Sequence, residues 1–310
     1  MKIAILGATS QIAKDLTKSM IKAGSHKLYL YARRPQLIQT QFRQSDKTTI
    51  EHIGNFESFD RTEEFDALIN FVGVGNPGAV ALMGSEIFDV TLKFDQLAIS
   101  YIRLHPQCRY VFLSSGAAYG NSFNKPVDEN SQASLPINIF KPQDWYGAAK
   151  LYAECLHRAY SELAIIDIRI FNYFSSSQDL GANFLMCDVV RSIRDRTTLR
   201  TDACNIVRDY LTPHDFHNLI EAVLNSAPIN NVVDGYSLSP VDKFTLLSRM
   251  NELFGLKYEI IEPPVNQSAT GTKEHYYSLN TRASLYGYKP ELSSIEGLTS
   301  ETMLLLNQLM

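Results

Sequence analysis

Short apolar runs alternate with helical patterns along the first half of the chain, and this alternation constrains the fold more than any other feature. Several of the runs consist almost entirely of Ile, Val, Leu and Phe. Parallel strands that are covered on both faces have this composition, because neither side of the sheet meets water. The predicted strands are Lys2–Leu6, Lys27–Tyr31, Thr48–Ile53, Ala67–Gly73, Arg109–Ser115 and Ile165–Ile170, with a further strand near Asn231–Tyr236.

Helical patterns separate these strands, at Ile12–Ala23, Ser85–Leu104 and Asp144–Leu163, and Thr212–Asn225 is expected to return to the sheet as a helix. Repeated β-α units predict an α/β fold built on a doubly wound parallel Rossmann sheet. We expect residues 1–174 to form this domain, with 208–236 returning to it. The less regular segments 175–207 and 237–310 are expected to form a smaller, mixed C-terminal lobe that binds the substrate.

Composition excludes several functional classes. The net charge of −4 gives no basic surface for nucleic acid. The four cysteines are widely spaced and form no CxxC pair, which indicates reduced thiols in a cytoplasmic protein and no metal site. Residues 67–85 carry no charge, but Asn70, Asn76, Pro77 and four glycines interrupt them, so we expect a buried strand and a loop there, and no membrane span.

The first predicted strand runs into a turn, Gly7-Ala8-Thr9-Ser10-Gln11-Ile12-Ala13, and a helix follows. Free N–H groups and the positive end of the helix dipole suit a pyrophosphate at such a turn. A dinucleotide fingerprint has glycine at the places of Ser10 and Ala13, so the match is imperfect. The turn predicts cofactor contacts at Gly7, Thr9, Ser10, Gln11 and Ile12; the alternative is a purely structural turn.

Two arginines, Arg33 and Arg34, follow the second predicted strand, where an NAD-binding chain usually has Asp or Glu. Guanidinium groups suit a ribose 2′-phosphate through charge-assisted hydrogen bonds. The pair therefore favours NADP over NAD as the cofactor. Solvated loop charges are the alternative interpretation.

Tyr146 and Lys150 are four residues apart on a predicted helix, so their side chains share one face. An ammonium beside a phenol favours the phenolate and lowers the pKa of the tyrosine, which makes a general acid/base. The same spacing also occurs in ordinary amphipathic helices.

The run Arg109–Gly120 reads RYVFLSSGAAYG, and with Tyr146, Lys150 and the Gly7 turn it resembles the extended short-chain dehydrogenase/reductase family. Arg169–Asn172 and Arg208–Leu211, with Asp215 shortly after, are similar to later motifs of that family. The motifs occur in the family's order over about residues 1 to 290. The family contains nucleotide-sugar epimerases, dehydratases and reductases.

The resemblance implies a role for each matching residue. Tyr146 would be the acid/base, Lys150 would hold the nicotinamide ribose and lower the pKa of Tyr146, and Ser115 would bind the same substrate oxygen. Asn172 and Arg208 would face the substrate diphosphate; an ion pair of Arg208 with Asp209 or Asp215 is the alternative. Further cofactor contacts are expected at Asn55, Phe56, Phe71, Val72, Gly73 and Phe171, although the usual aspartate is missing at Asn55.

Dehydratases of the family place an acidic residue just after the serine or threonine, whereas this chain has Gly116-Ala117-Ala118. We therefore expect neither dehydration nor decarboxylation. The main expectation is NADPH-dependent reduction of a keto-sugar nucleotide, because a consumed cofactor is more often NADPH. The alternatives are a nucleotide-sugar epimerase and, from another class, a catalytically silent NADP-binding sensor.

Further candidates receive structural interpretations. His214 and His217 lie near a helix start and suit capping or packing better than metal binding, and Cys155 suits a core thiol better than a nucleophile. The resemblance also implies a homodimer formed by the helices Ser85–Leu104 and Asp144–Leu163. Ile87, Phe88, Phe94, Leu97 and Tyr101 would line that interface or face the sheet.

Overall fold

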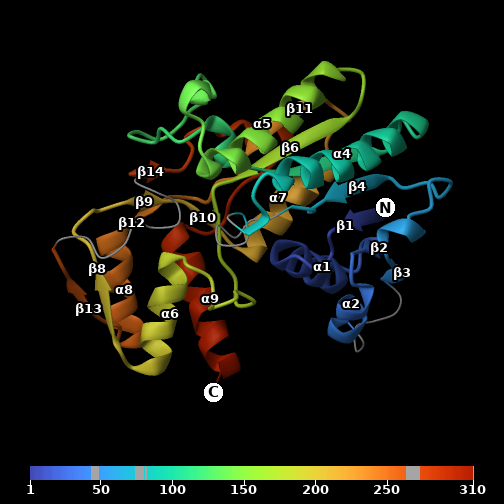
Figure 1. Ribbon diagram of the computed structural model, residues 1–310. Coiled ribbons are helices and arrows are strands. Elements are labelled where there is room, and N and C mark those ends of the chain that lie inside the picture. Colours follow the sequence, from blue (N-terminus) through green and yellow to red (C-terminus); the bar gives the residue numbers. More distant parts are fainter. Residues whose placement is uncertain (43–48, 74–79, 81, 263–272, 310) are drawn as a thin grey trace.

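Seven parallel strands form one central sheet in a computed structural model of the chain (Figure 1). The strand order β3-β2-β1-β4-β5-β6-β11 confirms the doubly wound α/β sheet predicted from the sequence. The structure describes residues 1–42, 49–73, 80, 82–262 and 273–309. The strands of the sheet are β1 (Lys2–Leu6), β2 (Lys27–Tyr31), β3 (Ile50–Gly54), β4 (Ala67–Asn70), β5 (Arg109–Ser115), β6 (Ile165–Ile170) and β11 (Asn231–Asp234).

Four strands, β1, β2, β5 and β6, have the predicted bounds, and the others differ at their ends. β3 begins at Ile50 and ends at Gly54, and Thr48 lies outside the described residues. β4 ends at Asn70 rather than Gly73, because the side chain of Asn70 accepts the N–H of Val72 at 2.9 Å and turns the chain out of the ladder.

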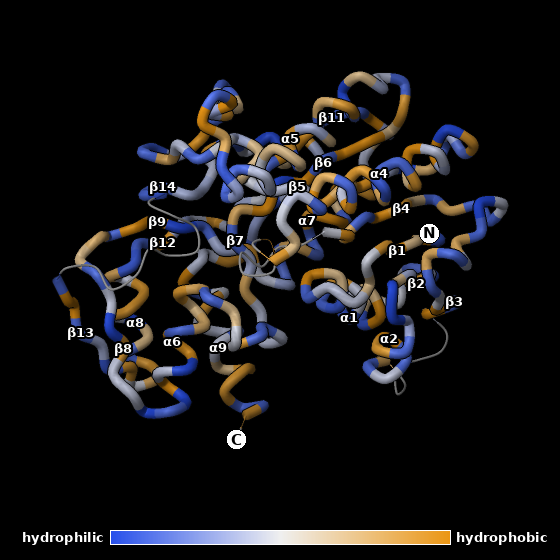
Figure 2. The backbone as a smooth tube through the Cα atoms, in the orientation of Figure 1, coloured by the Kyte–Doolittle hydropathy of each residue, from blue (hydrophilic) through white to orange (hydrophobic). Residues whose placement is uncertain are grey.

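Helices cover both faces of the sheet. Ile3 and Ile5 of β1 point to a core shared with α1 and α7, whereas Ala4 and Leu6 point to a core shared with α4 and α5. Strand residues alternate between faces, so one apolar strand supplies both cores. In Figure 2 the apolar colour runs along β4 and β6 between these helix layers. The α-helices are α1 (Gln11–Ala23), α2 (Pro35–Gln41), α4 (Glu86–Leu104), α5 (Pro142–Ala159), α6 (Leu185–Asp195), α7 (Pro213–Asn225), α8 (Lys243–Phe254) and α9 (Ser294–Leu309), and the short 3-10 helices are η1 (Phe56–Ser58), η2 (Gly116–Tyr119), η3 (Ile137–Ile139) and η4 (Arg282–Tyr286).

Helix α5 begins two residues earlier than predicted and ends at Ala159, four residues before Leu163. Pro142 occupies its first turn, where a missing N–H costs nothing, and Asp144 accepts the N–H of Lys141 at 2.8 Å. At the other end, the amide of Asn230 donates to the carbonyls of His157, Tyr160 and Leu163 at 2.8–3.0 Å. This distant side chain satisfies carbonyls that a longer helix would have used, and the local pattern does not reveal it.

The less regular segments of the sequence contain three helices. α6, α8 and α9 share a separate apolar core and gather with β8 (Thr198–Thr201) and β13 (Lys257–Ile260) at the lower left of Figure 1. α8 carried a readable signal, because Asp242 caps its start and Gly255 ends it in the left-handed conformation. The domain boundaries themselves stay a prediction. The remaining short strands are β7 (Asn172–Tyr173), β9 (Val207–Arg208), β10 (Tyr210–Leu211), β12 (Val241–Asp242) and β14 (His275–Tyr276).

Helices α4 and α5 pack side by side on one face of the sheet (Figure 1). Ile87 and Tyr101 of α4 are buried, so they face the sheet rather than a partner. Phe88, Phe94 and Leu97 are half-buried. None of the helices in the described residues combines the length and the apolar character that a membrane span requires.

Candidate active site

The turn after β1 lies against the turn after β4, at the point where the chain order of the sheet reverses. Gly7 has φ +78°, and a Cβ there would lie 2.8 Å from the nitrogen of Val72. Only glycine fits both the left-handed conformation and this close approach. Parallel sheets bind ligands at this crevice, and Gly7, Phe71 and Val72 border it.

Ser10 begins helix α1 as its N-cap, and its hydroxyl accepts the N–H of Ala13 at 3.4 Å. Serine, which stands here where the fingerprint has glycine, therefore caps the helix. Other N–H groups of the first turn, as at any helix start, are not used inside the helix and suit an anion. The geometry of Gly7 and the start of α1 fits the pyrophosphate of a dinucleotide.

The residues that are expected to bind the adenosine part of the cofactor lie along the same edge of the sheet, at the ends of β2 and β3. Arg33 and Arg34 are exposed there, and Arg34 precedes the first residue of α2. Asn55 caps the short helix η1 by accepting the N–H of Ser58 at 2.9 Å. Phe56 packs on Phe94 of α4 with ring centres 4.4 Å apart.

Ser115, Tyr146 and Lys150 come together at the carboxyl end of β5. A Cβ at Gly147 would collide with the carbonyl oxygen of Ala117, so glycine lets α5 lie directly on η2. This contact puts the half-buried Tyr146 near Ser115, whose hydroxyl acts to lower the pKa of the phenol. Ser115 also accepts the N–H of Ala117 at 3.2 Å, which fixes its rotamer.

The side chain of Lys150, one turn along α5 from Tyr146, is buried. Its ammonium donates to the carbonyl of Leu113 at 2.7 Å, stands 4.4 Å from the ring centre of Phe112 and is 6.0 Å from that of Tyr146. Burial lowers the pKa of Lys150 to about 8, although Asp95, Glu154 and Asp167 oppose the shift. A Cβ on Gly73 would lie 3.6 Å from the ammonium, so Lys150 faces the loop after β4.

The expected effect of Lys150 on the tyrosine is not found. Burial raises the pKa of Tyr146, and the hydroxyl of Ser115 opposes that rise. The ammonium of Lys150 donates to the carbonyl of Leu113 at 2.7 Å, and its charge is not among the causes that change the pKa of Tyr146. The spacing of Tyr146 and Lys150 along the helix predicted that their side chains share one face. It could not predict which group the ammonium contacts.

Two residues that the sequence analysis missed, Tyr276 and Lys273, also lie at this site. The hydroxyl of Tyr276 is 3.4 Å from that of Ser115, and its ring packs edge-on against Phe123 with centres 4.7 Å apart. The ammonium of Lys273 stands 4.5 Å from the ring centre of Tyr276, and burial lowers the pKa of Lys273 to about 8. Both residues come from the C-terminal part of the chain, more than 100 residues from Tyr146. No local sequence motif predicts that they lie at this site.

The expected substrate residues both lie at Tyr276, Asn172 at its main-chain carbonyl and Arg208 at its ring. The guanidinium of Arg208 is 5.9 Å from the ring centre of Tyr276 and donates to the carbonyls of Val207 and Glu274. Asn172 donates to the carbonyl of Asp209 at 2.9 Å. The ring of Phe171 occupies the space that a side chain on Gly116 would need, beside Ser115.

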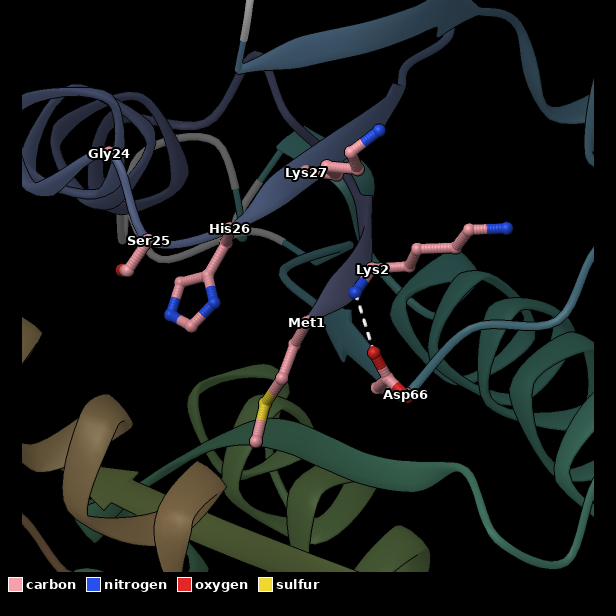
Figure 3. Close-up of a pocket in the computed structure, with 7 residues that line it drawn as sticks. All are labelled: Met1, Lys2, Gly24, Ser25, His26, Lys27 and Asp66. Atoms are coloured by element: carbon pink, nitrogen blue, oxygen red, sulfur yellow. Dashed lines mark hydrogen bonds between the residues drawn. The ribbon is translucent and has the colours of Figure 1, made fainter.

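A shallow hollow of about 410 Å³ lies elsewhere, at the amino ends of the strands (Figure 3). The candidate residues follow the carboxyl ends of the strands, so this hollow is a separate feature. It is lined by Met1, Lys2, Gly24, Ser25, His26, Lys27 and Asp66.

Histidines and cysteines of the described residues form no grouping of three or more potential metal ligands with Asp or Glu. His214 pairs with Glu291 at 2.7 Å, and His217 lies 3.6 Å from Glu221. Cys155 is exposed on α5, so the expectation that it is a core thiol was wrong.

A family model described as "NAD dependent epimerase/dehydratase family" matches residues 3–233. The chain belongs to this family. The match covers the sheet and all three residues at the end of β5 and on α5, which confirms the resemblance to the extended short-chain dehydrogenases/reductases.

Sequence relatives are distant. UDP-glucose 4-epimerase 4 of Oryza sativa subsp. japonica is 29% identical over 130 residues, which cover 41% of this chain and 33% of that protein. The matched segment thus spans about a third of the length of this relative.

Solved structures of family members share the fold over the whole chain. The UDP-glucuronic acid 4-epimerase of Bacillus cereus, in complex with UDP-glucuronic acid and NAD, superposes with a TM-score of 0.76, 16% identity and full coverage of both chains. The UDP-N-acetylglucosamine 4-epimerase of Methanobrevibacter ruminantium gives 0.78 and 17%, with 99% and 98% of the two chains covered. The dTDP-glucose 4,6-dehydratase of Bacillus anthracis gives 0.77 and 14%, with 98% and 96% covered. At these identities the likeness shows the fold.

Proposed function

We propose that this family member is a nucleotide-sugar epimerase that uses a nicotinamide cofactor. The observation that carries the proposal is the joint placement of Ser115, Tyr146 and Lys150 beside a turn, η2, that contains no carboxylate. Hydride exchange needs an acid/base and an oxygen-binding hydroxyl. Elimination would need a further acid, and Gly116–Tyr119 supplies none. The 4-epimerases among the relatives favour carbon 4 as the reacting carbon.

In this proposal Tyr146 takes the proton of a sugar hydroxyl while Ser115 holds the same oxygen. The cofactor, when bound, supplies the acceptor for the hydride that leaves the same carbon. Inversion would require the keto-sugar to present its opposite face before hydrogen returns to that carbon, and Tyr146 would return the proton to the oxygen. No net oxidation occurs, so the cofactor is not consumed.

Lys150 would hold the cofactor ribose. Its buried ammonium faces Gly73 in the loop after β4, and Gly7 and the start of α1 would hold the pyrophosphate. The raised pKa of Tyr146 means that the phenol is protonated in the free enzyme at neutral pH. Positive charge brought by an oxidised nicotinamide ring would lower that pKa.

The identity of the cofactor rests on Arg33 and Arg34. Both are exposed at the end of β2, where they offer paired donors for a 2′-phosphate. We therefore propose NADP(H), although the relatives solved with a cofactor carry NAD.

Substrate binding is assigned to the lobe side of the site. Arg208 and Lys273 both stand at the ring of Tyr276, so two cations flank one aromatic side chain. Their charge suits the diphosphate of a nucleotide sugar. Asn172, which is held by main-chain carbonyls, borders the same space.

Reduction of a keto-sugar nucleotide is the second candidate, and the arginines at β2 favour it, because reductive enzymes more often consume NADPH. One experiment separates the two functions. The purified chain is incubated with hydroxy- and keto-sugar nucleotides and with NADPH or NADP⁺, while absorbance at the nicotinamide band and the sugar products are followed. An isomerised sugar without net cofactor change supports the epimerase. Stoichiometric loss of NADPH makes the protein a reductase, and no reaction with any sugar nucleotide contradicts both.

A further inference from the structure

Two side chains of α1 hold the segment in which the chain leaves the sheet for the lobe. The amide of Gln11 donates to the hydroxyl of Ser175 and to the side-chain oxygen of Gln178, both at 3.0 Å. One turn further along α1, Asp15 accepts the hydroxyl of Ser177 at 2.8 and 2.9 Å. Positions i and i+4 share a helical face. Gln11 and Asp15 therefore both hydrogen-bond the same short segment, residues 175–178.

The contact at Asp15 is buried, and it is made by a carboxylate. Asp15 is 5% exposed and also accepts the phenol of Tyr173 at 3.1 Å. Hydrogen bonds to an ionised group are roughly twice as strong as neutral ones. We call these six residues the clasp: Gln11, Asp15, Tyr173, Ser175, Ser177 and Gln178.

The clasp is anchored on its other side as well. Glu301 of α9 accepts the N–H of Ser176 at 2.6 Å. Ser175 is fully buried, and its hydroxyl lies 3.0 Å from that of Ser177. The segment is thus tied both to the first helix of the sheet and to the last helix of the lobe.

The clasp lies between the two parts of the candidate cofactor site. Gln11 is the first residue of α1, directly after the Ser10 cap and in the turn whose geometry fits a pyrophosphate. Phe171 and Asn172, next to Ser115 and Tyr276, come just before Tyr173 in the chain. Movement of the segment would therefore displace both the phosphate turn and the residues beside the reacting oxygen.

We propose that Asp15, Ser177 and Gln178 are positioning residues that act through Gln11 to hold the phosphate turn and slow the release of the nicotinamide cofactor. The inference rests on the proposed function in requiring a nicotinamide cofactor at the Gly7 turn. A slow release suits an epimerase, because its cofactor is restored in every cycle. A reductase must exchange its cofactor at each turnover and gains nothing from the clasp.

The test is the dissociation rate of NADPH from the full-length protein. The protein is loaded with NADPH and chased with excess NADP⁺, and the decay of nicotinamide fluorescence is recorded by stopped flow. In Ser177→Ala/Gln178→Ala we expect the rate to rise about tenfold, the effect of losing about one to two hydrogen bonds. Gln178→Ala alone removes one half-buried acceptor and should give a smaller rise of the same sign. Ser248→Ala, at an exposed serine of α8, is the matched control.

Thermal unfolding of the cofactor-free proteins separates positioning from folding. A dissociation rate within twofold of the wild type in both clasp variants overturns the proposal, whatever their unfolding temperatures. A raised rate with an unfolding temperature near that of the wild type supports it. If the wild type binds no nicotinamide cofactor at all, the clasp proposal and the proposed function both fail. If it binds NADPH but converts no sugar, the proposed function alone fails, and the dissociation rate still decides the role of the clasp.

Discussion

His157 of α5 is buried between two carboxylates, and its Nδ1 lies 2.6 Å from Asp167 of β6. Its Nε2 lies 2.7 Å from Asp95 of α4. A neutral imidazole can donate from one nitrogen only, so two carboxylate partners require the protonated ring. The ion triad therefore joins the two helices beneath the catalytic candidates to the sheet, two turns along α5 from Lys150.

This triad predicts a stability that falls in alkaline solution. Burial alone would lower the pKa of His157, but the hydrogen bonds and charges of Asp167 and Asp95 raise it to about 9. A raised folded-state pKa contributes stability that is complete below the unfolded value near 6.5 and is lost as the pH rises towards 9. We expect a contribution on the order of 3 kcal/mol, measured as the free energy of unfolding in urea at pH 6.5 and 9.5.

The comparison must be with His157→Gln, because other buried groups titrate in the same range. The lowered pKa values of Lys150 and Lys273, both about 8, act in the opposite direction, since folding is then favoured as those lysines deprotonate. The difference between wild type and variant should shrink from pH 6.5 to 9.5. A difference that stays constant would mean that His157 is not charged in the folded state.

Replacing Tyr146 by phenylalanine removes the proposed acid/base and leaves the ring. We expect kcat to fall by about 10²- to 10⁴-fold, the usual contribution of a positioned proton donor. Affinity for NADPH, measured by fluorescence titration, should stay within a few-fold of the wild type. Near-normal turnover together with normal cofactor binding would remove Tyr146 from the mechanism.

The arginines after β2 predict a selective effect on one cofactor. In Arg33→Ala/Arg34→Ala, NADPH should bind about tenfold more weakly at low salt, because charge-assisted bonds to the 2′-phosphate are lost. NADH lacks that phosphate and should bind as before, so it serves as the internal control. Unchanged NADPH affinity would assign both arginines to the solvated surface.

The hydroxyl of Tyr276, 3.4 Å from that of Ser115, predicts a smaller effect than the loss of Tyr146. Tyr276→Phe keeps the packing on Phe123 and removes one hydrogen-bonding group. We expect kcat/KM to fall about three- to tenfold, as for one neutral hydrogen bond. Tyr277→Phe, at the neighbouring residue, is the matched control, and equal values for the two variants would exclude a specific role of the Tyr276 hydroxyl.

Gly147 predicts a geometric effect on the site. A Cβ in Gly147→Ala would meet the carbonyl oxygen of Ala117 and push α5 away from η2. We expect a loss of about 1 to 3 kcal/mol in the free energy of unfolding and a fall in kcat, because Tyr146 moves from Ser115. Tyr152→Ala, on the exposed face of α5, should change neither property by a comparable amount. A fully active Gly147→Ala would show that the close contact of α5 with η2 is dispensable.

Periodicity predicted the sheet well, because a strand that is covered on both faces is apolar along its whole length. β1, β2, β5 and β6 have the predicted bounds, and the Gly7 turn lies where the sequence put it. The lobe was harder to predict. Its helices α8 and α9 separate apolar from polar residues less sharply than α1 does, so their patterns are weaker, whereas the amphipathic pattern of α6 is strong.

The sequence by itself determined the sheet, the Gly7 turn and the residues of the Ser115, Tyr146 and Lys150 set, because local spacing and strand ends place them. Only the tertiary structure decided the distances that govern their chemistry. Lys150 donates to the carbonyl of Leu113, and burial raises the pKa of Tyr146. Tyr276 and the clasp at Asp15 join parts of the chain more than 100 residues apart, and such contacts arise from packing, which no local pattern encodes.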